Sequence, residues 1–278
     1  MALSVNGGFG SKGGGSNPNL LDNGWFTINQ RGATSYESVS SDMYTFDRWY
    51  IWRVAVSKSN GVVTVSHTNT NSGGFSQRFE SGLSDALVGK TVTASVMLSD
   101  GTIKSVTGIL SDAITYLSVN LTDNISLKVS SGNIRIYCEG VVSDSVSIRA
   151  IKLEYGSTST LALDSAPDYA TELLKCQRYY YKMPTGLIGS ALARNNTSAN
   201  VFIMLPTTMR IIPTITIHGT INLSDGVNAN PITSFSTIGN GYNTVSCLAN
   251  STGLTQFRSY VLAIPSGDTN YLDISADL

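Results

Sequence analysis

Catalysis and metal binding depend on a few residue types, and this sequence has few of them. Histidine occurs only at His67 and His218, so a multi-histidine metal site cannot be assembled. The three cysteines, Cys138, Cys176 and Cys247, lie far apart inside apolar or aromatic runs, and none belongs to a Cys-x-x-Cys pair. We interpret them as buried free thiols and expect no metal site.

Carboxylates can act in pairs without histidine, as they do in glycosidases, which hold two of them a defined distance apart. The spacing of the carboxylates singles out no such pair among Asp22, Asp42, Asp47, Glu80, Asp100, Asp112 and Glu139. The GxSxG, HExxH, Walker and Rossmann patterns are also absent from the sequence. We therefore expect no enzymatic activity and no catalytic residue.

Calcium is the one metal that the sequence leaves open. Loops of β-sandwiches hold it with oxygen atoms, and Asp22, Asn23 and Asp47 are residues of that kind. No other cofactor is expected.

Sugar recognition pairs flat aromatic faces with side chains that bond hydroxyl groups. The tryptophans cluster in the first third of the chain, and from this cluster we take Trp25, Tyr50, Trp52 and Arg53 as candidate ligand-binding residues. The competing interpretation is that large aromatic residues of a β-sandwich fill its core, and we favour the core for Trp25 and Trp49. For the polar residues nearby, structural anchoring is favoured over ligand binding: Gln30, Arg31, Asp47, Arg48 and Glu154.

A second group of candidates lies in polar segments of the C-terminal half. Arg194, Tyr242 and Asn243 belong to segments rich in Asn, Gly, Ser and Thr, a composition typical of exposed loops. The longest such segment, 222–242, is expected to be a loop. The tyrosines 179–181 are expected to pack against neighbouring chains rather than bind ligand.

Alternation of apolar residues predicts antiparallel strands over most of the chain. It is clearest in 92–98, 125–129 and 134–138, and it returns in 201–205, 260–264 and 272–276. In 145–153 the alternation slips, which predicts either a bulge or a strand covered on both sides. Segment 168–181 is the one helical candidate, with Asp168 as its cap.

The sequence therefore predicts an all-β protein, with a jelly-roll β-sandwich, a short helix-like connector and a second, small antiparallel β-sandwich head. The predicted divisions are a flexible N-terminal lead or attachment peptide (1–18), the jelly-roll domain (19–160), the connector (161–181) and the C-terminal head (182–278). Only 13% of the 278 residues are charged and the net charge is −1, so nucleic acid is not an expected partner. No apolar run reaches the length needed for membrane insertion.

Several short motifs, in order, resemble those of bacteriophage and prophage tail fibre proteins that carry a carbohydrate-binding-module-like jelly roll. They are NLLDNGWFTINQRG, TFDRWYIW, SQRFES with LVGKTVTASVML, IRAIKLEYGSTST, DYATELLKCQRYYYK, LPTTMRIIPTITI and YLDISADL. The resemblance covers residues 19–278. It implies a homotrimeric receptor-binding protein in the virion, at the tail fibre, tail tip or baseplate, that adheres to host surface polysaccharide or wall glycan and is attached to other tail proteins through its N-terminus.

Two alternatives from other classes stay open. One is a structural tail or baseplate spacer that contacts no receptor. The other is an accessory carbohydrate-binding module of a polysaccharide-degrading enzyme.

Overall fold

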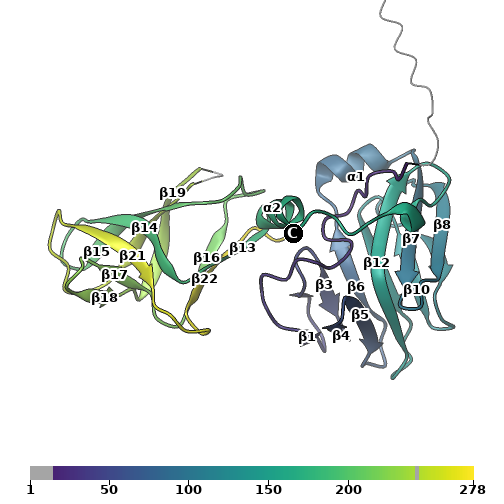
Figure 1. The fold of residues 1–278 in the computed structure, drawn as a ribbon, viewed down its shortest axis with the longest axis horizontal. Helices are drawn as coiled ribbons and strands as arrows, with labels where there is room; N and C mark the ends of the chain where they lie inside the picture. Colours follow the sequence, from purple (N-terminus) through teal and green to yellow (C-terminus); the bar gives the residue numbers. More distant parts are fainter. Residues whose placement is uncertain (1–14, 242–243) are drawn as a thin grey trace, which may run out of the picture. The chain divides into compact units, whose positions relative to one another are not determined.

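The computed structural model describes residues 15–241 and 244–278, and its chain contacts form two compact units (Figure 1). The first unit contains the described residues up to Trp25 together with Arg53–Ala166, and the second contains Phe26–Trp52 together with Pro167–Leu278. The segment Phe26–Trp52 thus groups with the C-terminal part of the chain. The predicted divisions at 19–160, 161–181 and 182–278 stay a prediction, and most of the predicted lead lies outside the described residues.

The first unit is built from antiparallel strands in two sheets. In chain order its elements are β4 (Val54–Ser59), β5 (Val62–His67), β6 (Gly73–Arg78), α1 (Ser81–Leu87), β7 (Thr91–Leu98), β8 (Ile103–Ile109), β9 (Leu117–Asn120), β10 (Ile125–Val129), β11 (Asn133–Cys138), β12 (Ser145–Tyr155) and the 3₁₀ helix η1 (Leu161–Leu163). The strands of this unit follow the order β4-β5-β12-β7-β8 in one sheet and β6-β11-β10-β9 in the other. The predicted all-β class is confirmed, whereas the short helix α1 was not predicted.

Strands β10 and β11 form a hairpin in which apolar residues alternate with the residues of the outer face. The register pairs Val129 with Ile134 and Ile125 with Cys138, so alternate residues of both strands point into the same core. Ile134, Ile136 and Cys138 are fully buried. The residues between them are left on the outer face of the sheet, which is the face that becomes relevant below.

Strand β12 contains the bulge that the slip of alternation predicts, between Ile148 and Ala150. After the bulge, Ala150, Ile151, Lys152 and Leu153 are all buried, so both faces of the strand are covered there. The Lys152 ammonium is neutralised there, because its Nζ lies 2.8 Å from Asp164 Oδ1 and donates to Thr160 Oγ1 at 2.8 Å.

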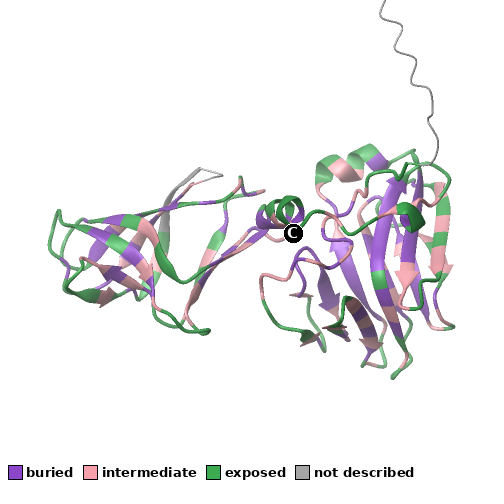
Figure 2. Cartoon of the chain, viewed as in Figure 1, coloured by how far each residue is buried: buried purple, intermediate pink, exposed green. Residues whose placement is uncertain are grey.

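The second unit combines the segment Phe26–Trp52 with the C-terminal part of the chain. Its elements are β1 (Ser35–Glu37), β2 (Met43–Tyr44), β3 (Tyr50–Trp52), α2 (Tyr169–Gln177), β13 (Tyr180–Met183), β14 (Gly186–Ala193), β15 (Ser198–Met204), β16 (Thr214–His218), β17 (Asn222–Ser224), β18 (Ala229–Pro231), β19 (Ser234–Gly241), β20 (Thr244–Asn250), β21 (Ser259–Ile264) and β22 (Tyr271–Ser275). The C-terminal strands form a three-stranded sheet, β13-β22-β16, and a seven-stranded sheet, β18-β17-β21-β14-β15-β20-β19. Their apolar residues form one core cluster that includes Val201, Cys247 and Leu272, and Figure 2 shows the buried stripes along the strands.

Helix α2 begins at the predicted cap, because Thr171 N donates to Asp168 Oδ2 at 2.8 Å. The prediction that the helix continues to residue 181 is wrong. It ends at Gln177, and Tyr180 starts β13, where it pairs with Ser275. Three successive tyrosines favour a strand, since aromatic side chains fit a pleated surface better than a helix.

The prediction that 222–242 is one long loop is also wrong. Strands β17, β18 and β19 all lie within it, so a segment rich in Asn, Ser and Thr forms strands here. Polar composition alone therefore did not distinguish these strands from loops. None of the described helices is long and apolar enough to cross a bilayer.

Candidate functional site

The residues proposed from sequence as ligand contacts fall into different environments. Trp25 and Arg53 are half-buried in the first unit, whereas Tyr50 is buried and Trp52 half-buried in the second. Arg194 is exposed at the end of the β14 strand. Tyr242 and Asn243 lie outside the described residues, so their proposed role stays a prediction.

Tyr50 and Trp52 belong to a row of aromatic residues within the second unit. The ring centroids of Tyr50 and Trp52 are 6.1 Å apart, and those of Tyr44 and Tyr50 are 5.8 Å apart. Trp49 is fully buried and meets Phe26 edge-on at 5.3 Å, so the core role favoured for it is confirmed. With Tyr50 only 6% exposed, this row is mainly a packing feature.

Asp47 and Gln30 anchor the chain, as the sequence suggested. Both carboxylate oxygens of Asp47 accept hydrogen bonds from Gln30, Oδ2 from the backbone N at 2.6 Å and Oδ1 from Nε2 at 2.5 Å. Burial raises the pKa of Asp47 above its ordinary value, while these hydrogen bonds oppose the rise. Asp47 is thus fully committed to holding the backbone near Gln30.

A cluster that the sequence did not single out lies on the outer face of the sheet β6-β11-β10-β9. We call it the tyrosine face, and it comprises Ser76, Tyr116, Ser126, Lys128, Asn133, Arg135 and Tyr137. Arg135 pairs with Lys128 on one side and with Ser76 on the other, so three strands contribute to one row. Tyr137 pairs with Ser126 in the adjacent row.

Cations hold the tyrosine rings of this face in place. The Arg135 guanidinium lies 4.1 Å from the ring centroid of Tyr116 and 5.1 Å from that of Tyr137. Lys128 Nζ lies 3.7 Å from the centroid of Tyr137 and 3.4 Å from Glu139 Oε1. Arginine and lysine thus supply donors directly beside aromatic surface, which is the pairing that hydroxyl-rich ligands require.

Tyr116 reaches this face from a loop that is braced locally. Asp112 accepts hydrogen bonds from Ile114 N at 2.7 Å and Thr115 N at 2.6 Å, and these bonds lower the pKa of Asp112 to about 2. Asn133 Nδ2 then donates to the Tyr116 hydroxyl at 3.2 Å. Hydrogen bonds therefore position Tyr116 both through the backbone of its loop and at its hydroxyl group.

Several buried polar atoms of the tyrosine face have no hydrogen-bond partner among the described residues, and they include Ser76 Oγ, Ser126 Oγ and Asn133 Oδ1. Leaving such an atom unsatisfied costs about 1–3 kcal/mol, so native proteins keep few of them. The tyrosine face therefore has hydrogen-bonding capacity that its own residues do not satisfy.

The arrangement is suited to binding, and His67 and Cys138 of the same unit are both buried. His67, the histidine of the first unit, directs both ring nitrogens at backbone carbonyls, those of Val141 at 2.8 Å and Asn71 at 2.9 Å. Burial raises the pKa of Cys138 to about 12. Among the described residues no group of three or more His, Cys, Asp or Glu side chains could hold a metal ion.

Alternation in the NIRIYC segment contains the signal that could have found this face. Once Ile134 and Ile136 are assigned to the core, Arg135 and Tyr137 must point outward together. The contribution of Tyr116 could not be found in this way, because it comes from a loop.

Comparisons with known proteins add little. No family model matches the chain, and no curated protein matches it. One solved structure, the N-terminal CBM22-1-CBM22-2 tandem domain from Paenibacillus barcinonensis Xyn10C, aligns over 95% of this chain and 98% of that one, with 9% identity and a TM-score of 0.24. A likeness of this size carries no argument about fold or function, which rest on the geometry above.

Proposed function

We propose that this protein is a non-catalytic adhesin of the tail fibre type, which binds host surface polysaccharide or wall glycan through the tyrosine face. The observation that carries the proposal is the set of buried, unsatisfied polar atoms beside two tyrosine rings flanked by Arg135 and Lys128. Sugar rings pack their C–H faces on aromatic surface, and their hydroxyl groups satisfy neighbouring donors and acceptors.

The location and assembly belong to the same proposal. We place the protein in the virion, at the tail fibre, tail tip or baseplate, with residues 1–18 as the attachment to other tail proteins. The motif resemblance across residues 19–278 supports this placement. Weak binding at one site would then be strengthened by several linked copies.

An exposed apolar row supports a contact between copies of the chain, and we propose that this contact assembles a homotrimer. On the seven-stranded sheet Phe202 pairs with Ser190 and Ser190 with Val261, and Phe202 and Met204 are 46% and 73% exposed. Exposed apolar side chains on one face commonly mark a contact between proteins. Light scattering should give the mass of three chains, and Phe202→Ser should weaken that assembly.

Binding of the full chain to immobilised lipopolysaccharide, capsular polysaccharide and wall teichoic acid tests the proposed function. Tyr137→Ala and Arg135→Ala should each weaken binding to the recognised polymer at least about tenfold, a loss of about 1.4 kcal/mol. Tyr155→Ala and Arg149→Ala are matched controls from strand β12 of the same unit and should bind normally.

Circular dichroism should confirm that all four variants are folded. Failure to bind any of the polymers, or equal binding by the Tyr137 and Tyr155 variants, would reject the tyrosine face as the binding site. The first of these results would favour a structural spacer.

A further inference from the structure

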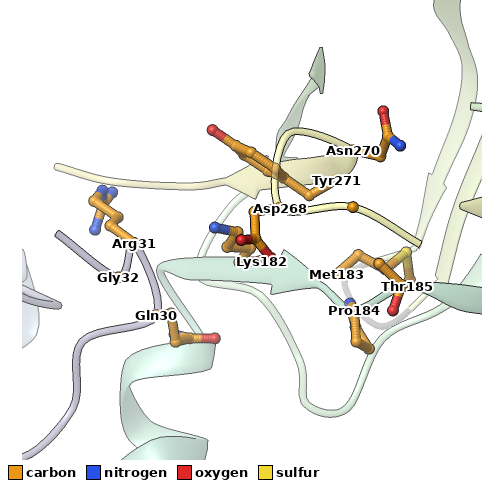
Figure 3. A pocket seen from close by; sticks show the side chains of 11 residues that line it. Gln30, Arg31, Gly32, Lys182, Met183, Pro184, Thr185, Asp268, Asn270 and Tyr271 are labelled. Atoms are coloured by element: carbon orange, nitrogen blue, oxygen red, sulfur yellow. The ribbon is translucent and has the colours of Figure 1, made fainter. Parts of the chain in front are cut away.

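The second unit contains a pocket of about 670 Å³, and none of the residues proposed from sequence as ligand contacts lines it (Figure 3). Its lining comes from three stretches of the chain, Gln30–Gly32, Lys182–Thr185 and Gly267–Tyr271, of which residue 269 alone makes no contribution. We call it the polar pocket. A volume of this size falls in the range of pockets that bind small organic ligands.

The polar pocket lies at one face of the three-stranded sheet. Register pairs His218 with Tyr271 and Lys182 with Asp273, which places these four side chains on the same face. The opposite face carries Leu272 and Ile274, both fully buried in the core. The floor of the pocket is therefore fixed by an apolar core beneath it.

Two neighbouring side chains fix the position of the Tyr271 ring on this face. Its ring stacks on His218, with centroids 4.2 Å apart, and Lys182 Nζ lies 4.0 Å from its centroid. Because β22 lies between β13 and β16, these two neighbours approach the ring from opposite sides. The hydroxyl end of Tyr271, and not a ring face, is what the pocket presents.

Contacts within the protein hold Gln30 and Arg31, which form one wall of the pocket, in place without a ligand. Gln30 Nε2 donates to Tyr180 O at 2.7 Å as well as to Asp47. Arg31 Nη2 lies 2.5 Å from Asp277 Oδ2, and the guanidinium lies 3.7 Å from the ring centroid of Tyr180. A preformed wall reduces the ordering cost of binding.

Several polar groups of the lining remain available. Among the described residues, Lys182 forms no ion pair, Asp268 accepts no hydrogen bond, and Arg31 Nη1 is buried without a hydrogen-bond partner. Figure 3 shows Lys182 and Asp268 among the side chains that line the pocket with Tyr271. Together they offer donors and acceptors within reach of one small ligand.

The charges of the lining favour an uncharged ligand. Asp277 balances Arg31, and Lys182 and Asp268 are one cation and one anion. A carboxylate accepts from hydroxyl groups and an ammonium donates to them, so this pair suits a polyhydroxylated ring without a charge of its own. A charged ligand would gain no net electrostatic attraction from this balanced lining.

We propose that the polar pocket binds a neutral saccharide unit, a hexose or N-acetylhexosamine, of the glycan that the protein recognises. The inference rests on the proposed function and adds a second site of different chemistry to it. Asp268 accepts hydroxyl protons of the sugar, and Lys182, Arg31 Nη1 and the Tyr271 hydroxyl donate to its oxygen atoms.

Saturation-transfer NMR on the full chain tests the pocket with the methyl glycosides of glucose, galactose, mannose, N-acetylglucosamine and N-acetylgalactosamine, and with glucuronic acid as a charged probe. At least one neutral glycoside should bind, and glucuronic acid should bind more weakly. Asp268→Asn and Lys182→Met should each reduce the affinity at least about tenfold. The matched controls Asp85→Asn and Lys90→Met, exposed in the first unit, should leave it unchanged.

The experiments can reject the proposal for the pocket and the proposal for the tyrosine face separately. The inference is overturned if none of the neutral glycosides binds, if glucuronic acid binds best, or if Asp268→Asn binds as the wild type does. Binding of the glycosides must also survive Tyr137→Ala, because loss in that variant would assign them to the tyrosine face. Polysaccharide binding that still depends on Tyr137 would leave the proposed function intact.

Discussion

The tyrosine face and the polar pocket both lie on a sheet with an apolar core beneath, but they are assembled differently. The tyrosine face takes five of its seven residues from one hairpin, β10–β11, with Ser76 and Tyr116 added from either side. The polar pocket brings together residues near positions 30, 183 and 270. One is a product of local alternation, and the other depends on contacts distant in sequence.

This difference in assembly predicts which substitutions should disrupt each site. Local pairing and the core position the tyrosine face, whereas hydrogen bonds of Asp47 and Asp277 hold the wall of the polar pocket. Substitutions in the core should therefore lower the free energy of unfolding by similar amounts in both regions. Changes to buried polar anchors should affect the pocket alone.

The largest expected effect comes from the two cores. Ile136→Ala beneath the tyrosine face and Ile274→Ala beneath the pocket each empty a fully buried position, and each should lower the free energy of unfolding by about 2–5 kcal/mol. Urea unfolding followed by circular dichroism measures both. A loss below about 1 kcal/mol in one variant only would show that its sheet is not supported in the same way.

Much of this architecture could be predicted from the sequence. The β10–β11 alternation, the bulge in β12 and the Asp168 cap follow from residue order alone, since each depends on neighbours a few positions away. The prediction that the cysteines are buried and free is also confirmed.

Other features could not be predicted, for physical reasons. The pocket wall depends on Arg31 meeting Asp277, 246 positions away, which no local pattern specifies. The strands β17–β19 were missed because their segment is rich in Asn, Ser and Thr, which also favour loops. The tyrosine face contains no tryptophan, because all three tryptophans lie between residues 25 and 52, so their clustering in the sequence indicates another region.

A smaller effect, confined to the pocket, is expected from Asp47→Ala. Gln30 N and Nε2 would lose their shared acceptor, at a cost of about 1–3 kcal/mol in unfolding free energy. Binding of the methyl glycoside should weaken while polysaccharide binding at the tyrosine face persists, and both are measured by NMR titration. Asp47→Asn keeps one acceptor oxygen and should lose less. Equal weakening of both binding activities would contradict the separation of the two regions.

Acidification should distinguish the two regions by the sign of its effect. Burial raises the pKa of Asp47, so the folded state holds this proton more tightly, and its contribution to stability is present at low pH and lost as the pH rises through the folded pKa. Asp112 has a pKa lowered to about 2, so its contribution is present above 3.8 and lost as the pH falls toward 2.

Amide shifts in ¹H–¹⁵N spectra report both titrations. The amides of Ile114 and Thr115, which bond Asp112, should titrate with a midpoint of about 2, and the amide of Gln30, which bonds Asp47, with a midpoint above 3.8. A Gln30 midpoint below 3.8 would mean that hydrogen bonding outweighs burial at Asp47.

The smallest expected effect is on the reactivity of two thiols, one in each unit. Cys138 follows Tyr137 in β11 and Cys247 lies in β20, and burial raises the pKa of each to about 12. In a Cys176→Ser variant, a disulfide reagent at mildly alkaline pH should therefore label neither thiol until local opening exposes it. Saturating polysaccharide should slow the labelling of Cys138 and leave that of Cys247 unchanged, because only β11 contributes to the tyrosine face. Slowing at Cys247 instead would place the bound polymer on the second unit.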